Sequence, residues 1–215
     1  MKQGYTDITV VLDRSGSMSS IRDDMNGGFA TFVAAQRGLP GTCLVSMVQF
    51  DGTATEVRYV GTPIGEVGPL DLQPRGNTPL LDAVAFSIRL TGERLAALPE
   101  EARPENVLLL IITDGQENAS QHTTAAALKE TIEHQRAVYK WEFIYLGANV
   151  DAFAEARMMG IPAERTADYD ADATGVREAW DVISPKFAAF RRGDKEALKY
   201  TEAERRRMKR EKTPR

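Results

Sequence analysis

The sequence predicts an α/β domain in which helices cover both faces of a mostly parallel β-sheet. Five apolar runs rich in β-branched and aromatic residues have the length and composition of strands. Two of them, at residues 8–12 and 107–112, are almost continuously apolar, which is typical of strands buried on both faces. Segments with apolar residues at helical spacing separate most of the strands, as right-handed crossovers between parallel strands require.

The strands and one of their turns can be assigned from local pattern. A tight Asp51-Gly52 turn joins the second strand to the third, which is a hairpin signal, so the third strand should run antiparallel to the second. The remaining strands should be parallel, which leaves one antiparallel edge strand. The five expected strands span residues 8–12, 43–50, 55–60, 107–113 and 141–146.

Five helices are expected between and after these strands. In the first, Ile21, Met25, Phe29 and Phe32 repeat at helical spacing, although Gly27-Gly28 should make it less regular. The other apolar stripes lie at residues 81–95, 125–132, 150–158 and 176–190. Residues 61–77, with four glycines and three prolines, should form a long irregular loop, and such loops inside compact domains are often functional.

Composition excludes several classes of protein. The chain has 215 residues, of which 42% are hydrophobic, so it can bury a sizeable core. A net charge of −4 gives no case for binding nucleic acid over the whole surface. One cysteine, Cys43, excludes an intrachain disulfide and a multi-cysteine zinc site. Apolar runs are far shorter than the roughly 18 residues of a membrane span. We therefore expect a soluble, cytoplasmic protein without a signal peptide.

The carboxyl-terminal residues differ from the rest. Residues 191–215 hold eleven Lys/Arg and five Asp/Glu, a net charge of +6, so we expect a domain at 1–190 and a basic tail at 191–215. The tail should be a solvated helix or disordered. A weak contact with nucleic acid or an acidic partner is the alternative, but no aromatic residue follows Tyr200 to stack on bases.

Oxygen-bearing side chains follow two of the buried strands. Asp13 ends the first strand and precedes Ser15 and Ser17, Asp114 ends the fourth, and Thr78 begins the helix after the long loop. Ligands of open parallel sheets bind beyond the carboxyl ends of the strands. If the first and fourth strands are neighbours, Asp13 and Asp114 face the same crevice, and Thr78 can reach it.

These residue types indicate a hard cation. Two carboxylates and three hydroxyls offer only oxygen ligands, which suit Mg²⁺, Mn²⁺ or Ca²⁺ rather than zinc or copper. The carboxylates balance a dication, and the neutral hydroxyls donate little charge. The metal should therefore remain electrophilic and accept a carboxylate from outside, which makes a binding site without any catalytic group.

The pattern Asp13-x-Ser15-x-Ser17, then Thr78, then Asp114-Gly115 resembles the metal-ion-dependent adhesion site of von Willebrand factor A (vWA) domains. The resemblance covers about residues 7–190. It implies a Rossmann-like sheet of order 3-2-1-4-5-6, in which the serines and the threonine contact the metal and the aspartates act directly or through water. It also implies a protein partner that supplies Asp or Glu. The chain is similar to compact bacterial or phage-encoded single-domain vWA proteins.

Single residues have simpler interpretations. Taken singly, Ser17 and Thr78 could be no more than helix caps, and Asp114-Gly115 could be no more than a turn. The occurrence of all these residues together favours the metal site. Arg14 should point outward as a solvated residue at the rim of the site. The other candidate rim contacts for a partner are Asn77, Gln116 and Glu117.

An enzyme is not expected. No His or Lys accompanies the 13–17 loop, and neither a nucleophile elbow nor a dinucleotide-binding motif follows the first strand. The main alternative is a Mg²⁺-dependent phosphatase or phosphotransferase that uses Asp13, although Ser15 stands where a general acid would be needed. A non-catalytic scaffold in a phage or stress-resistance assembly is a further alternative.

Overall fold

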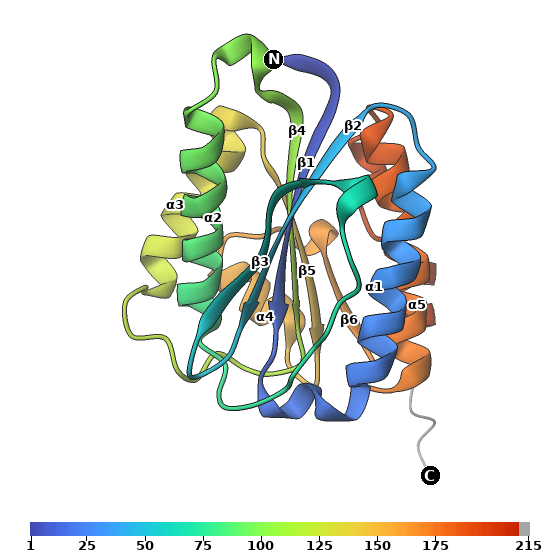
Figure 1. Ribbon diagram of the computed structural model, residues 1–215. Helices are drawn as coiled ribbons and strands as arrows, with labels where there is room; N and C mark the ends of the chain where they lie inside the picture. The colour runs from blue at the N-terminus through green and yellow to red at the C-terminus, as the bar shows by residue number, and fades with distance from the viewer. Residues whose placement is uncertain (211–215) are drawn as a thin grey trace.

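The computed structural model describes residues 1–210 and contains one six-stranded sheet between two layers of helices (Figure 1). The strand order is β3-β2-β1-β4-β5-β6, and only β3 pairs antiparallel with its neighbour among these strands. This confirms the predicted architecture, including the antiparallel edge strand. The strands are β1 (Lys2–Asp13), β2 (Thr42–Phe50), β3 (Thr55–Pro63), β4 (Pro104–Thr113), β5 (Glu142–Ala148) and β6 (Thr166–Tyr169).

The helices divide between the two faces of the sheet. α1 and α5 cover one face, whereas α2, α3 and α4 cover the other, and each layer has its own apolar cluster (Figure 1). None of the helices in the described part of the chain is long and apolar enough to cross a membrane. The α-helices are α1 (Arg22–Arg37), α2 (Leu80–Ala96), α3 (Ala125–Tyr139), α4 (Ala152–Met158), α5 (Ala173–Arg191) and α6 (Glu202–Met208).

Aromatic side chains join α1 to α5. Phe32 lies with its ring centroid 5.5 Å from that of Trp180 and 5.3 Å from that of Phe187. A Cβ at Gly28 would lie 1.9 Å from Trp180 Cδ1, so only glycine permits this approach. The expected irregularity at Gly27-Gly28 is wrong, because α1 is a continuous helix and Gly28 is used for packing.

Two strands differ from the pattern seen in the sequence. β1 begins at Lys2, six residues before the apolar run, because its first residues extend beside the start of β4. β6 was not among the five strands assigned from residue pattern, since it has only four residues, Thr166 to Tyr169, and one of them is Asp168. It forms the edge beside β5.

The basic segment expected as a tail is packed against the domain over its described part. α5 ends at Arg191, and Leu198, Tyr200 and Met208 beyond it belong to the same buried cluster as α1 and α5. Lys186 Nζ of α5 donates hydrogen bonds to two carbonyl oxygens of this segment and lies 2.9 Å from Glu204 Oε1. Residues 211–215 lie outside the described residues.

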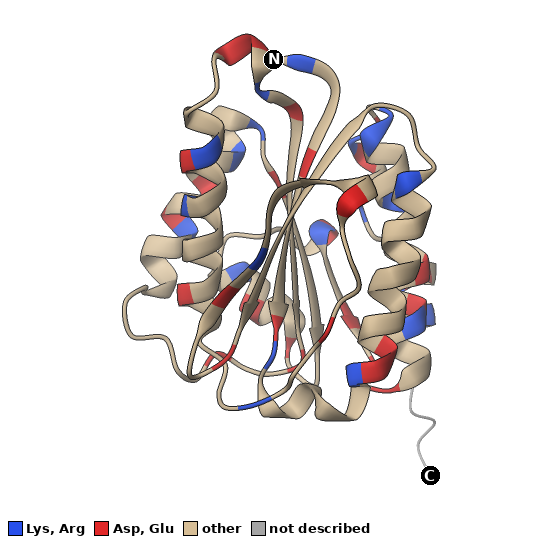
Figure 2. Ribbon diagram, viewed as in Figure 1, with Lys and Arg blue, Asp and Glu red and all other residues tan. Residues whose placement is uncertain are grey.

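Acidic side chains of the domain pair with the basic residues of this segment. Arg207 pairs with Glu178 at 2.7 Å, Lys209 pairs with Asp168, and Arg210 contacts Asp172 at 2.5 Å. Figure 2 shows Lys and Arg positions intermixed with Asp and Glu positions along the helices of both layers. The positive charge of the segment is therefore partly compensated by the body of the protein.

Candidate metal centre

The candidate site lies where β1 and β4 end. These two strands pair in parallel, with Leu12 opposite Ile112, so the residues that follow them emerge side by side at the carboxyl edge of the sheet. Figure 1 shows both strands ending at the same edge of the sheet, where the chain turns into α1. Asp13 is fully buried and Asp114 is 2% exposed. The order of the central strands therefore brings together two carboxylates that are distant in sequence.

Hydrogen bonds join the two carboxylates to the serine loop. Ser17 Oγ donates to Asp114 Oδ1 at 2.6 Å, and Ser15 Oγ lies 3.1 Å from Ser17 Oγ. Asp13 Oδ1 accepts from the Ser15 backbone N–H at 2.6 Å, and its Oδ2 accepts from Thr113 Oγ1 at 2.5 Å. Each side chain is thus held in place by a neighbour from the same site or from the strand beside it.

Gly115 marks the space that these oxygens share. A Cβ built on Gly115 would lie 2.9 Å from Thr78 Oγ1 and 3.7 Å from both Asp13 Oδ2 and Ser15 Oγ. Oxygens from two separate chain segments therefore surround one point, beside the backbone of Gly115 in a third segment, that a methyl group would fill. The structure brings together all five residues expected to bind a metal.

The start of α2 explains why the Thr78 hydroxyl is available. The first free N–H groups of a helix need acceptors, and here residues 117–120 supply them. Asn118 Oδ1 accepts from Thr78 N at 2.9 Å, and Glu117 Oε2 accepts from Leu81 N at 2.9 Å. The interpretation of Thr78 as a helix cap is wrong, because the N-cap is Pro79 without a side-chain bond. Within residues 1–210, Thr78 Oγ1 makes no hydrogen bond.

The electrostatics of the site fit a cation. Burial raises the pKa of Asp13 to about 6, although hydrogen bonds from Thr113 and Ser15 act in the opposite direction and lower it. Burial also raises the pKa of Asp114, against the hydrogen bond from Ser17. Asp114 Oδ2 is buried and has no hydrogen-bond partner among the described residues. A divalent cation would compensate the cost of burying the two carboxylates and would provide a partner for this unpaired oxygen.

The donor set also restricts the kind of metal. Over the described residues, no group of three or more His, Cys, Asp or Glu side chains is placed to hold an ion. A metal at this edge must therefore use the hydroxyls as well as the two aspartates. Oxygen-only coordination with a low ligand charge is the chemistry of hard cations such as Mg²⁺.

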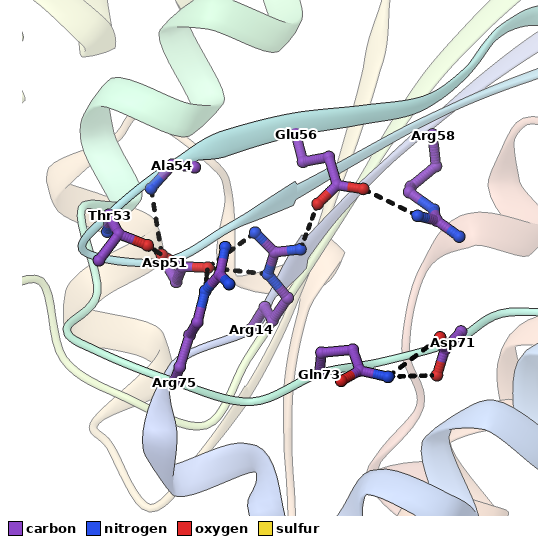
Figure 3. Close-up of polar contacts among 9 residues, drawn as sticks. All are labelled: Arg14, Asp51, Thr53, Ala54, Glu56, Arg58, Asp71, Gln73 and Arg75. Carbon is purple, nitrogen blue, oxygen red and sulfur yellow. Dashed lines mark hydrogen bonds and ion pairs between the residues drawn. The ribbon is translucent and has the colours of Figure 1, made fainter.

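Arg14 does not lie at the rim as expected. It is 3% exposed, and its Nε donates to Asp51 Oδ2 at 2.8 Å while a terminal nitrogen contacts Glu56 Oε2 at 2.5 Å (Figure 3). The Arg14 backbone N–H also donates to the Phe50 carbonyl at 2.8 Å. The outward prediction was wrong because Asp51, at the end of the adjacent strand β2, provides a buried acceptor that local pattern does not reveal.

The other expected rim residues separate into two groups. Asn77 and Gln116 are exposed beside the site. The Glu117 carboxylate instead accepts hydrogen bonds from Leu81, Ala119 and Ser120, so it holds the loop after β4 against α2. Sequence reasoning missed this role, as it missed Asp51, which was assigned only to a turn.

Similarity to solved structures supports the same architecture. A proximal thread matrix protein 1 from the mussel byssus, with a zinc-occupied MIDAS motif, superposes with a TM-score of 0.60 at 16% identity over 86% of this chain and 46% of that one. A von Willebrand factor type A structure from Catenulispora acidiphila superposes with a TM-score of 0.54 at 19% identity, over 86% of this chain and 42% of that one. This chain has a vWA fold. It spans less than half the length of either of these two proteins.

A third similar structure has a length close to that of this chain. An aerotolerance-related membrane protein from Bacteroides fragilis, carrying multiple mutations to serine, gives a TM-score of 0.50 at 14% identity, with 84% of this chain and 97% of that one covered. No protein-family model and no curated protein sequence matches the chain. In this vWA fold, the oxygen-bearing residues lie at the carboxyl edge of the central strands.

Proposed function

We propose that this protein is a metal-dependent protein-binding module, in which a divalent cation, with Mg²⁺ preferred, captures an acidic side chain of a partner protein. The observation that carries the proposal is the convergence of Asp13, Ser15 and Thr78 oxygens on the space beside Gly115. Ser17 and Asp114 complete the donor set through their 2.6 Å contact.

Charge balance explains why a partner would bind through the metal. The two aspartates neutralise a dication, whereas the hydroxyls of Ser15, Ser17 and Thr78 add no formal charge. The cation would keep its attraction for one more anionic oxygen. Access exists on the outer side, where Ser17, Asn77 and Gln116 are exposed. The zinc-occupied MIDAS motif of the mussel protein supports a divalent cation at a site of this type.

Two measurements test this proposal. Calorimetric titration of the purified chain with Mg²⁺, Mn²⁺, Ca²⁺ and Zn²⁺ should show one site, with an affinity that falls in Ser15→Ala but not in the exposed Ser20→Ala control. Affinity purification should recover partners in Mg²⁺ that are lost in EDTA and lost with Ser15→Ala. Absence of divalent uptake, or identical partners with and without EDTA, would contradict the proposal.

We further propose that the module acts without catalysis. A phosphotransferase would need Asp13 as a nucleophile, but this carboxylate is fully buried and both of its oxygens accept hydrogen bonds. Ser15 stands two residues later, where it cannot serve as a general acid. Incubation with Mg²⁺ and beryllofluoride should give no Asp13 adduct, and phosphate esters should not be hydrolysed. An adduct that disappears in Asp13→Asn would support the enzyme alternative instead.

A further inference from the structure

A polar hollow lies beside the candidate metal centre. It has a volume of about 300 Å³ and is lined by Ser19, Arg22, Gln73, Pro74 and Arg75. Ser19 lies in the short 3-10 helix Gly16–Ile21, which also contains Ser17. The hollow therefore adjoins the loop that carries the serine hydroxyls.

Backbone hydrogen bonds fix the two walls of the hollow to each other. The Arg75 N–H donates to the Arg14 carbonyl at 2.8 Å, and the Gly16 N–H donates to the Gly76 carbonyl at 3.1 Å. The segment that carries Arg75 is thus bound directly to the chain between Asp13 and Ser17. A ligand in the hollow and a ligand on the metal would be close neighbours.

The charges around Arg75 leave one positive charge uncompensated within the connected ion pairs. Asp51 Oδ2 accepts from Arg14 Nε at 2.8 Å and from Arg75 Nε at 3.0 Å, and Glu56 contacts both Arg14 and Arg58 (Figure 3). Three guanidinium groups therefore share two carboxylates. Arg75 is the most accessible of the three, with its side chain 54% exposed, whereas that of Arg14 is 4% exposed.

Arg22 provides a second guanidinium on the opposite wall. Its Nε donates to Asp23 at 2.8 Å, and its side chain is 52% exposed. Both Arg22 and Arg75 thus use Nε for their own carboxylate partners, and within residues 1–210 their terminal nitrogens donate to no acceptor. Asp71 is close enough to attract Arg22 electrostatically, but it accepts two hydrogen bonds from Gln73 and does not line the hollow. The described lining contains no carboxylate.

This arrangement suits a second carboxylate of the partner. Once a partner acid binds a cation that two aspartates already neutralise, the metal centre has no charge left to attract another acid. Exposed guanidinium groups bind carboxylates through paired N–H donors, and two arginines line the hollow.

Resting on the proposed function, we propose that the hollow is a second acid-binding subsite and that the partner presents two Asp or Glu side chains a few residues apart. One carboxylate binds the cation, and the other lies between Arg22 and Arg75. The recognised partner is then a doubly acidic segment of a protein rather than any single exposed acid.

Peptide selection on the full chain tests this proposal. A displayed library with one fixed Glu and random flanking residues is selected in Mg²⁺ against the wild type, the Arg22→Gln/Arg75→Gln double variant and the Arg89→Gln control, whose arginine is exposed on α2. The wild type and the control should enrich a second Asp or Glu. A synthetic peptide carrying both acids should bind about tenfold tighter than the same peptide with the second acid changed to Gln.

The arginine double variant tests the acid-binding subsite, whereas EDTA and Ser15→Ala test the metal-dependent module. The double variant should lose the preference for a second acid but keep Mg²⁺-dependent binding of the first. If the wild type has no preference for a second acid, or the double variant keeps it, the subsite is wrong while Mg²⁺-dependent enrichment still supports the metal-dependent module. If enrichment is the same in EDTA or with Ser15→Ala, the metal-dependent module is wrong and the linked subsite fails with it.

Discussion

Ser17 Oγ donates a 2.6 Å hydrogen bond to Asp114 Oδ1, although the two residues are 97 positions apart in the chain. The contact exists because β1 and β4 are neighbours in the sheet and both end at the same edge. It places a hydroxyl and a carboxylate from different segments within reach of one ion. A substitution at this contact can therefore weaken metal binding and at the same time raise the stability of the metal-free protein.

Replacing Asp114 with Asn should weaken metal binding and stabilise the metal-free protein. Burial is the largest cause of the raised pKa of Asp13, and charge repulsion from Asp114 adds to it. Removing one of the two charges should raise the free energy of unfolding in EDTA by up to about 1 kcal/mol. Divalent affinity should fall about tenfold or more, because one of only two anionic ligands is lost. Urea unfolding with EDTA and with Mg²⁺ measures both effects, and a loss of stability in EDTA would contradict this account.

Gly115→Ala should block the metal site sterically without removing any ligand. The added Cβ would lie 2.9 Å from Thr78 Oγ1, closer than a Cβ can approach without displacement of its neighbour. Because Mg²⁺ requires near-ideal geometry, we expect its affinity to fall about tenfold or more in calorimetric titration. Gly65→Ala is the matched control, since its Cβ would meet nothing within 4 Å. Equal affinities of the two variants would place the ion elsewhere.

The central fold and the clustering of the five oxygen-bearing residues could be predicted because both follow from local pattern. The runs at 8–12 and 107–112 are apolar enough to identify central strands, and Asp13 and Asp114 follow them directly. Parallel neighbours must end at one edge, so the crevice follows from topology. Thr78 was harder to assign, since a Thr-Pro pair before a helix also indicates a cap. The two roles are separated only by the hydrogen bonds that the backbone N–H groups of Thr78 and Leu81 donate to Asn118 and Glu117.

The remaining features depend on contacts that no local pattern contains. Arg14 is buried because Asp51 follows the paired strand β2, which a charge in a turn sequence does not indicate. β6 is short and half polar, so its composition does not distinguish it from a loop. Residues 191–210 have the composition of a solvated tail, but three widely spaced apolar residues, Leu198, Tyr200 and Met208, are buried in the core.

Asp51→Asn should destabilise the fold at neutral pH and do so less in acid. Burial would raise the pKa of Asp51, but hydrogen bonds from Thr53, Arg75 and Arg14 outweigh it and lower the pKa to about 2. A carboxylate whose pKa is lower in the folded than in the unfolded protein stabilises the fold. This stabilisation is complete at a pH above the pKa of the unfolded state and is lost as the pH falls toward the pKa of the folded state. This contribution is about 2 kcal/mol at pH 7, with about half of it lost by pH 3.

The measured loss should exceed that contribution at pH 7, because the variant also leaves Arg14 buried with only Glu56 as a counter-charge. We expect the free energy of unfolding measured in urea to fall by about 3 kcal/mol. Asp181→Asn, at an exposed position on α5, should stay within about 0.5 kcal/mol of the wild type at both pH values. A difference between Asp51→Asn and wild type that is independent of pH would show that the charge of Asp51 is not what holds Arg14.

Met208→Ala should destabilise the whole domain, because the segment after α5 forms part of its core. Met208 is fully buried in the cluster that contains α1 and α5, and its carbonyl accepts a 3.0 Å hydrogen bond from Asp170 N just after β6. Truncating a buried methionine costs about 2–5 kcal/mol. Met158→Ala, at a position 49% exposed, is the matched control and should change stability by about 0.5 kcal/mol or less. If thermal and urea unfolding show equal effects for the two variants, residues 191–210 are not needed to complete the fold.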